Sequence, residues 1–94
     1  MTKEELKMNS GLVRELFKGL NDDEVLRIEL INGNKIYCLP SDAVCVAPVI
    51  VKIMKTIKKG KYQIIIIDPK AIAVVCTMSR KTYDLKLQRG ELYV

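Results

Sequence analysis

The spacing of apolar residues predicts a helix at the start of the chain. Thr2-Lys3-Glu4-Glu5 fits a capping box, with a hydroxyl at the N-cap and a carboxylate three residues later. Apolar residues then recur at helical spacing and form a single face, made of Leu12, Val13, Leu16, Phe17 and Leu20. We therefore expect a helix over residues 2–20 that docks on the rest of the fold. The pattern leaves open whether Ser10-Gly11 divides it into two shorter helices.

From Val25 the period of apolar residues changes to two, which is typical of strands. Leu26, Ile28 and Leu30 point to one side of the predicted strand. Asn32-Gly33 follows, and this pair favours a tight hairpin because both residues accept a positive φ. Residues 35–39 form the predicted return strand, and Pro40-Ser41-Asp42 forms a corner.

The segment from Val44 to Ile57 fits two structures. Val46, Ile50, Ile53 and Ile57 match a helix over residues 48–59 that ends at Gly60. An alternating strand fits equally well. The β-branched content, together with a turn at residues 58–61, favours a long hairpin over the helix.

Two runs of β-branched residues flank a turn at Asp68-Pro69-Lys70-Ala71, within the stretch Ile64–Val75. Neither run alternates with polar residues, so we expect both faces of these strands to be covered. A chain this short can cover both faces by curling its sheet into a barrel or by lending one face to another subunit. Residues 77–81 are predicted to be a polar connector, followed by a final pair of strands at Thr82–Leu87 and Leu92–Val94.

Composition supports self-association and permits an anionic partner. Of the 94 residues, 49% are hydrophobic, which exceeds what a small core holds and favours a subunit interface within a single domain, residues 1–94. The net charge of +5 is compatible with nucleic acid. An acidic start without an apolar core segment, and no apolar stretch long enough for a membrane span, indicate a cytoplasmic protein without a membrane partner.

The chemistry-bearing residues argue against an enzyme. The chain has no His, so the commonest general base and metal ligand is missing, and it has no phosphate-binding glycine loop or paired carboxylates. Cys38, Cys45 and Cys76 lack the Cys-x-x-Cys spacing of zinc sites and are expected to be free, buried thiols. We therefore expect no catalysis, no metal and no cofactor.

The order of these elements resembles the Sm-like family, whose bacterial branch includes the RNA chaperone Hfq. The resemblance rests on a helix before the first strand, on the strand-Asn-Gly-strand opening and on a second hairpin with a polar tip. It also rests on Ile67-Asp68-Pro69-Lys70-Ala71-Ile72, where Lys70-Ala71-Ile72 is similar to the Lys-His-Ala-Ile turn of the Hfq branch. The sequence departs from the family because the glycine of the second strand is replaced near Cys38, and no Arg-Gly or Tyr-Lys-His is present at 68–70.

The resemblance implies a mostly β fold with an N-terminal helix. It implies a small, strongly bent, five-stranded Sm-like (SH3-like) barrel over residues 25–76, with residues 77–94 as an extra C-terminal hairpin. It also implies a homo-oligomeric ring that binds single-stranded RNA near the first hairpin and near the turn between the last two barrel strands. By position, Asn32, Asn34, Asp68, Pro69 and Lys70 become candidate RNA contacts.

A basic cluster supplies further candidates for binding RNA. Lysines neutralise phosphates and a tyrosine can stack on an unpaired base. The cluster consists of Lys52, Lys55, Lys58, Lys59 and Lys61, with Tyr62 beside it. A solubilising loop next to an aggregation-prone strand explains the same lysines equally well.

The leading hypothesis is therefore a non-catalytic, ring-forming RNA-binding protein. The alternative is a small homo-oligomeric interaction or assembly module, as in viral or mobile-element accessory proteins, without nucleic-acid binding. A third hypothesis, a DNA-binding accessory protein, requires residues 48–59 to be helical.

Overall fold

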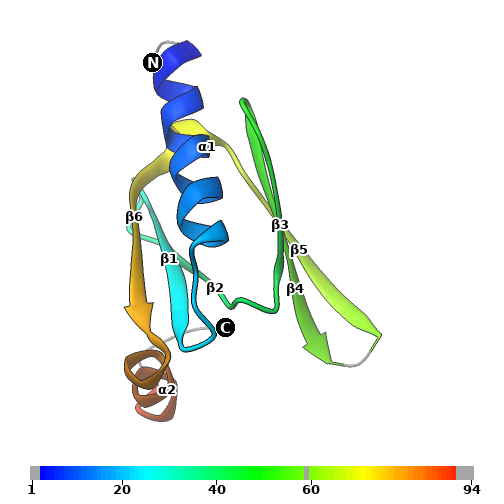
Figure 1. The fold of residues 1–94 in the computed structure, drawn as a ribbon, viewed down its shortest axis with the longest axis vertical. Coiled ribbons are helices and arrows are strands. Elements are labelled where there is room, and N and C mark those ends of the chain that lie inside the picture. Colours follow the sequence, from blue (N-terminus) through cyan, green and yellow to red (C-terminus); the bar gives the residue numbers. More distant parts are fainter. Residues whose placement is uncertain (1–2, 59, 91–94) are drawn as a thin grey trace.

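The computed structural model describes residues 3–58 and 60–90, with side chains over 10–56 and 60–90. Figure 1 shows the arrangement of the elements. In chain order they are α1 (Lys3–Lys18), β1 (Glu24–Leu30), β2 (Lys35–Cys38), β3 (Ala43–Ala47), β4 (Ile50–Lys58), β5 (Lys61–Ile67), the 3₁₀ turn η1 (Pro69–Ala71), β6 (Ile72–Ser79) and α2 (Arg80–Gln88).

The predicted N-terminal helix is confirmed as one continuous element. α1 runs through Ser10-Gly11 without a break, and Val13 is fully buried in the core. Leu16 and Phe17 pack against the same core from the next turn of the helix. Most of the apolar face predicted from the sequence is thus the docking face, but Leu12, a member of the predicted face, is 51% exposed. The proposed cap at Thr2 lies outside the described residues.

The predicted hairpin after α1 is also confirmed. β1 pairs antiparallel with β2, and its other edge pairs antiparallel with β6, so sheet A has the order β2-β1-β6. The amide of Gly33 donates to the carbonyl of Leu30 over 2.9 Å, and Gly33 has φ 88°. Asn32 keeps a negative φ, so the turn is a three-residue loop with glycine at the left-handed position rather than a two-residue Asn-Gly turn.

Residues 50–58 form a strand, so the helical interpretation of 48–59 is wrong. β4 is the central strand of sheet B, whose order is β3-β4-β5. Its alternate residues Val51 and Ile53 are fully buried against the core. The β-branched residues decide the outcome because their stiff side chains pack well on a pleated surface.

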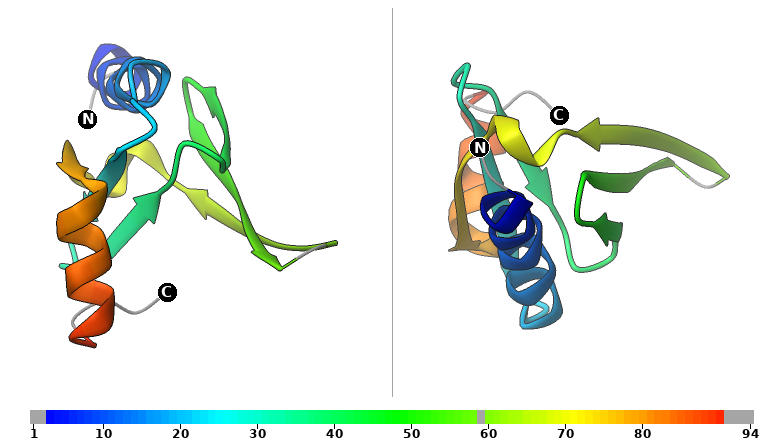
Figure 2. Two further views of the ribbon diagram at one scale, coloured as in Figure 1. Left: turned by 60° about the horizontal axis from the view of Figure 1, so that its bottom comes forward. Right: turned by 90° about the horizontal axis from the view of Figure 1, so that it is seen from above.

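The two sheets do not close into a barrel in the described part of the chain. They are joined between β2 and β3 by a turn in which the amide of Asp42 donates to the carbonyl of Leu39 over 2.9 Å. The core lies between sheet A, sheet B and α1, and the β4–β5 hairpin projects from the body (Figures 1 and 2). The structure is therefore mostly β, with two antiparallel three-stranded sheets among the described residues.

A buried ion pair fixes this corner. The Nζ of Lys55 on β4 lies 3.1 Å from the Oδ2 of Asp42, and these side chains are only 13% and 4% exposed. The same Nζ donates to the carbonyl of Tyr37 at the end of β2. Asp42 Oδ2 also accepts from the amide of Leu39 over 2.8 Å. One lysine thus ties the edge of sheet A to the middle of sheet B.

The predicted strand at Thr82–Leu87 is wrong, because residues 80–88 form α2. The predicted polar connector is also wrong, since β6 continues to Ser79. The Ser79 hydroxyl caps the helix by accepting from the amide of Thr82 over 3.1 Å. Tyr83, Leu85 and Leu87 fit an alternating strand in sequence, but a serine cap and the Arg80–Asp84 pair at 3.0 Å favour helical spacing.

Removal of the buried carboxylate should destabilise the fold strongly. Asp42→Ala leaves the Lys55 ammonium without its charge partner, which costs about 3–5 kcal/mol of unfolding free energy. The control is Asp84→Ala, which breaks a solvent-exposed pair worth about 0.3–0.5 kcal/mol. Urea unfolding of both variants measures the two losses. Equal losses would show that the corner does not depend on this ion pair.

Candidate nucleic-acid interface

Two turns that the sequence placed far apart lie side by side at one end of the molecule. The amide of Ile31, in the β1–β2 turn, donates to the carbonyl of Ala71 in η1 over 2.8 Å. Asn32 and Asn34 therefore lie next to the turn that carries Lys70. All three side chains belong to exposed residues. We call this group, Asn32, Asn34 and Lys70, the turn cluster.

The local sequence explains why Lys70 is presented at the surface. The Oδ1 of Asp68 accepts from the amide of Lys70 over 3.0 Å, and Pro69 occupies the first position of η1 with its ring buried. Asp68 thereby serves as the cap of the turn. The Asn32 side chain acts likewise, because its Oδ1 accepts from the amide of Asn34 over 3.0 Å. The backbone of the turn cluster is thus held by the side chains of Asp68 and Asn32.

The residues of the predicted basic cluster do not lie together with the turn cluster. Lys61 and Tyr62 are exposed at the tip of the β4–β5 hairpin, with Tyr62 60% exposed. The Lys58 side chain and the whole of Lys59 lie outside the described residues. β5 separates the tip from the turn cluster by its seven residues, which span roughly 20 Å at strand spacing.

Lys52 and Lys55 lie on opposite faces of β4. Lys55 faces the core side and is held in the ion pair with Asp42, so it does not join an exposed basic surface. Lys52 lies on the outer face, opposite Cys45 and Ile66 in the strand register. The basic cluster predicted from the sequence therefore does not form one surface patch.

The outer face of sheet B is apolar and uncovered within the single chain. Tyr62, Ile64 and Ile66 alternate along β5 and are 60%, 55% and 64% exposed. Across the register they face Thr56, Met54 and Lys52 of β4. Of the two ways in which both faces could be covered, closure of the sheet into a barrel is not found in the described residues, and coverage by another subunit stays a prediction. We call Tyr62, Ile64 and Ile66, with Met54 and Cys45, the apolar face.

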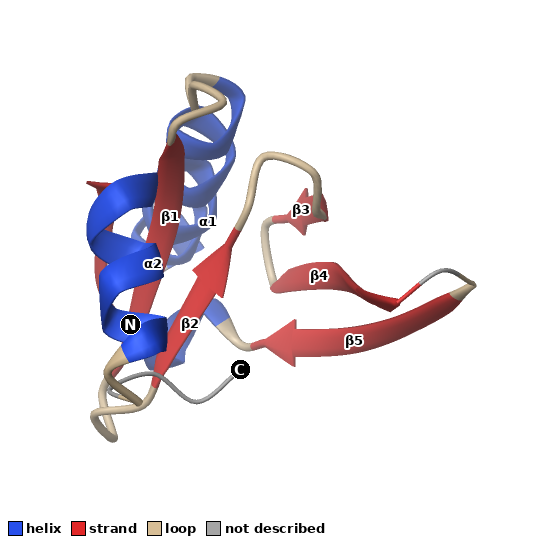
Figure 3. Ribbon diagram, turned by 90° about the horizontal axis from the view of Figure 1, so that it is seen from below, coloured by secondary structure: helices blue, strands red, loops and turns tan. Residues whose placement is uncertain are grey.

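A cavity that the sequence did not reveal lies between the two sheets. It has a volume of about 140 Å³ and is lined by residues of β2, of the β4–β5 hairpin and of α2. Figure 3 shows how these three elements are arranged. Its lining residues are Lys35, Ile36, Tyr37, Lys55, Gln63, Ile65 and Tyr83. The available signal was Gln63, a polar residue on the same strand face as Ile65 and Ile67.

Neither a metal site nor a membrane-spanning helix is found among the described residues. No group of three or more Cys, Asp or Glu side chains within 3–58 and 60–90 is arranged to hold a metal ion. Neither α1 nor α2, over their described lengths, is long and apolar enough to cross a bilayer. Comparison with protein-family models, curated proteins and solved structures finds no match for this chain.

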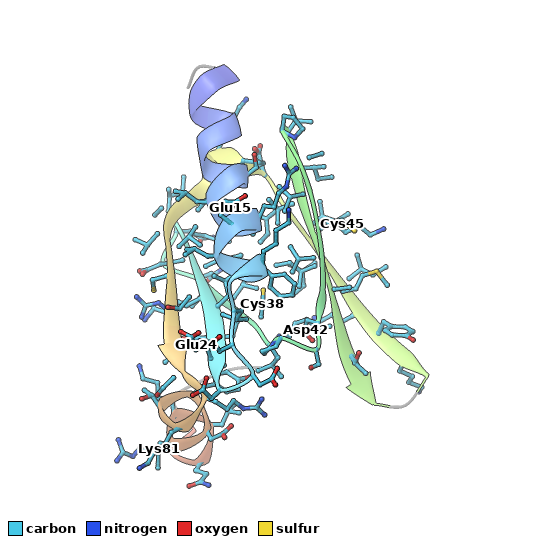
Figure 4. All side chains as sticks on the ribbon, in the orientation of Figure 1. Glu15, Glu24, Cys38, Asp42, Cys45 and Lys81 are labelled. Carbon is cyan, nitrogen blue, oxygen red and sulfur yellow. The ribbon has the colours of Figure 1, made fainter. Side chains whose placement is uncertain are left out.

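The three cysteines are free thiols in different surroundings. Cys38 lies inside the core, whereas Cys45 lies on the outside of β3 (Figure 4). Burial raises the pKa of the Cys38 thiol to about 12, with the nearby Lys55 ammonium opposing the rise. The expectation of buried thiols thus holds for Cys38, is wrong for Cys45, and is met in part by the half-buried Cys76.

Thiol-specific reagents should therefore label Cys45 much faster than Cys38. At pH 8 a thiol with the raised pKa is ionised in about one molecule in ten thousand, and only the thiolate reacts. We expect Cys45 to be labelled rapidly and Cys38 only after unfolding in guanidinium, as measured by mass spectrometry of labelled peptides. Cys45→Ser is the matched control. Rapid labelling of Cys38 in that folded variant would contradict the buried position.

Proposed function

We propose that this chain is a homo-oligomeric, Sm-like RNA-binding protein that holds single-stranded RNA at the turn cluster without catalysis. The observation that carries the proposal is the Ile31–Ala71 hydrogen bond, which places the two turns together. These are the two places at which the Sm-like resemblance puts RNA contacts. The amides of Asn32 and Asn34 can bond to bases, and the Lys70 ammonium can neutralise a phosphate.

The order of the strands supports the Sm-like part of the proposal. β6, β1 and β2 are consecutive neighbours in sheet A, and β3, β4 and β5 are consecutive neighbours in sheet B. If β2 and β3 are treated as two halves of one strand that bends at Asp42, the two sheets form one five-stranded order, β6-β1-β2/β3-β4-β5. The short turn η1 then separates its last two strands, as the resemblance implies, and α1 precedes its first.

The free strand edges support the oligomeric part. β5 and β6 are terminal strands of their sheets, with seven and eight residues, and each leaves one row of backbone groups unpaired by strands of the described chain. Long apolar edges pair readily with another chain. Antiparallel or parallel pairing of β5 with β6 of the next copy satisfies both edges and can continue around a ring. Lys70 would then repeat around that ring.

A second candidate function is an assembly module that binds no nucleic acid. The apolar face favours it, because a contiguous exposed apolar surface is typical of an interaction site. The two candidates differ in whether the turn cluster binds RNA. The DNA-binding alternative loses its basis, since residues 50–58 are a strand.

RNA binding should be salt-dependent and should depend on Lys70. Fluorescence anisotropy with short A-rich and U-rich oligonucleotides is measured across a salt series. Each phosphate contact contributes about 0.7 to the slope of log affinity against log salt for single strands. Lys70→Ala should therefore lower the slope by about 0.7 for each contact that the lysine makes.

Lys81→Ala is the matched control, because Lys81 is exposed on α2, away from both turns. It removes the same charge and should leave the slope close to that of the wild type. Binding that is absent at low salt would exclude the RNA-binding function and favour the assembly module. Equal effects of the two lysine variants would exclude the turn cluster as the site.

A further inference from the structure

The cavity between the sheets has an apolar part and an accessible polar rim. Ile36 of β2 and Ile65 of β5 are half-buried, pack against the same core and line the cavity from two different sheets. Tyr37 and Tyr83 close one end, with ring centroids 5.5 Å apart. Lys35 and Gln63 are exposed residues at the rim, so the cavity opens to solvent. Its 140 Å³ is below the roughly 300–1,000 Å³ of drug-sized pockets and suits one small ring.

Gln63 lies between Lys61 and two isoleucines on the inner face of β5, and among the described residues its side chain has no hydrogen-bond partner. In the register it lies opposite Lys55, and Ile65 and Ile67 follow it on the same face of β5. A primary amide carries both donors and an acceptor, which is the complement of the edge of a nucleobase.

The free edge of β2 adds a backbone donor to the cavity. The carbonyl of Tyr37 points away from β1, because it accepts a hydrogen bond from the Nζ of Lys55. In an antiparallel strand the amide of the same residue points to the same side. The Tyr37 amide therefore faces the cavity, where it can donate to a ligand.

We propose that this cavity binds one unpaired nucleobase of the bound strand, an inference that rests on the proposed RNA-binding function. The ring lies between Ile36 and Ile65, and its edge bonds to the Gln63 amide. The phosphate of the same nucleotide lies near the Lys35 ammonium. Unpaired bases of single-stranded RNA are recognised in this way, by apolar contact on the faces and hydrogen bonds at the edge.

The position of the cavity connects the two groups of candidate residues. Lys35 directly follows Asn34 of the turn cluster, and Gln63 directly follows Tyr62 at the hairpin tip. An RNA molecule that contacts the turn cluster can therefore continue along β2 and β5 toward Lys61.

Nuclear magnetic resonance titration of the full chain with mononucleotides tests the inference. Adenosine and uridine monophosphate should shift the Gln63 side-chain amide and the backbone amides of Tyr37 and Ile65. Ribose 5-phosphate, which lacks the base, should leave the Gln63 side chain unchanged. Shifts that are equal for ribose 5-phosphate and the nucleotides would show a phosphate site only and would overturn the proposal.

Two matched variants extend the test to oligonucleotides. Gln63→Ala should weaken binding about tenfold, since a well-placed amide–base pair contributes on this scale, while the salt slope stays at the wild-type value because no charge is removed. Gln88→Ala, at the exposed end of α2, should have no effect. Gln63→Asn retains the amide and confirms that the strand tolerates substitution.

The possible outcomes separate this inference from the proposed function. If Gln63→Ala binds as tightly as Gln88→Ala while Lys70→Ala is impaired, the base-binding cavity is excluded and the RNA-binding function stands. If the wild-type chain binds no oligonucleotide at low salt, both are excluded.

Discussion

The ion pair between Asp42 and Lys55 sets the angle at which the two sheets meet, and the other features depend on that angle. Without the corner, β2 could run on into β3 and β4 could lie along the edge of β2. Instead, Lys55 holds the carbonyl of Tyr37 and the carboxylate of Asp42 together. The sheets diverge beyond this point and the β4–β5 hairpin runs away from the body (Figures 2 and 3). The cavity lies beside β2, where residues of both sheets line it. The outer face of sheet B is exposed because it points away from the core.

As a result, the chain buries the inner face of sheet B and leaves the outer face exposed to solvent. The inner residues Val51 and Ile53 are fully buried, whereas Ile64 and Ile66 on the outer face are more than half exposed. Burial of a large aliphatic side chain contributes about 1.5–3 kcal/mol, so covering this face with a second copy is strongly favourable. Pairing of the free β5 and β6 edges is the arrangement that also satisfies backbone groups. The proposed self-association and the proposed ligand binding thus both depend on this open geometry.

Local patterns predicted much of the fold, and long-range contacts account for what they missed. The period of 3.6 gave α1, and the Asn-Gly turn gave the β1–β2 hairpin, because each is determined by neighbouring residues. Tyr83, Leu85 and Leu87 suit a strand or a helix, and the choice depends on the Ser79 cap and on packing against Tyr37. The charge pattern grouped Lys55 with the exposed lysines. Its position was decided by Asp42, thirteen residues earlier, which no local pattern reveals.

The molecular mass in solution tests most directly whether the free edge and the apolar face of sheet B join copies of this chain. Sedimentation velocity at micromolar concentration should give a closed assembly of several 10.7 kDa chains for the wild type. Ile66→Lys, which places a charge on the apolar face, should release single chains. Leu85→Lys on α2, an exposed apolar residue outside that face, should leave the assembly intact. A wild-type chain that sediments as a monomer throughout the concentration series would contradict the claim.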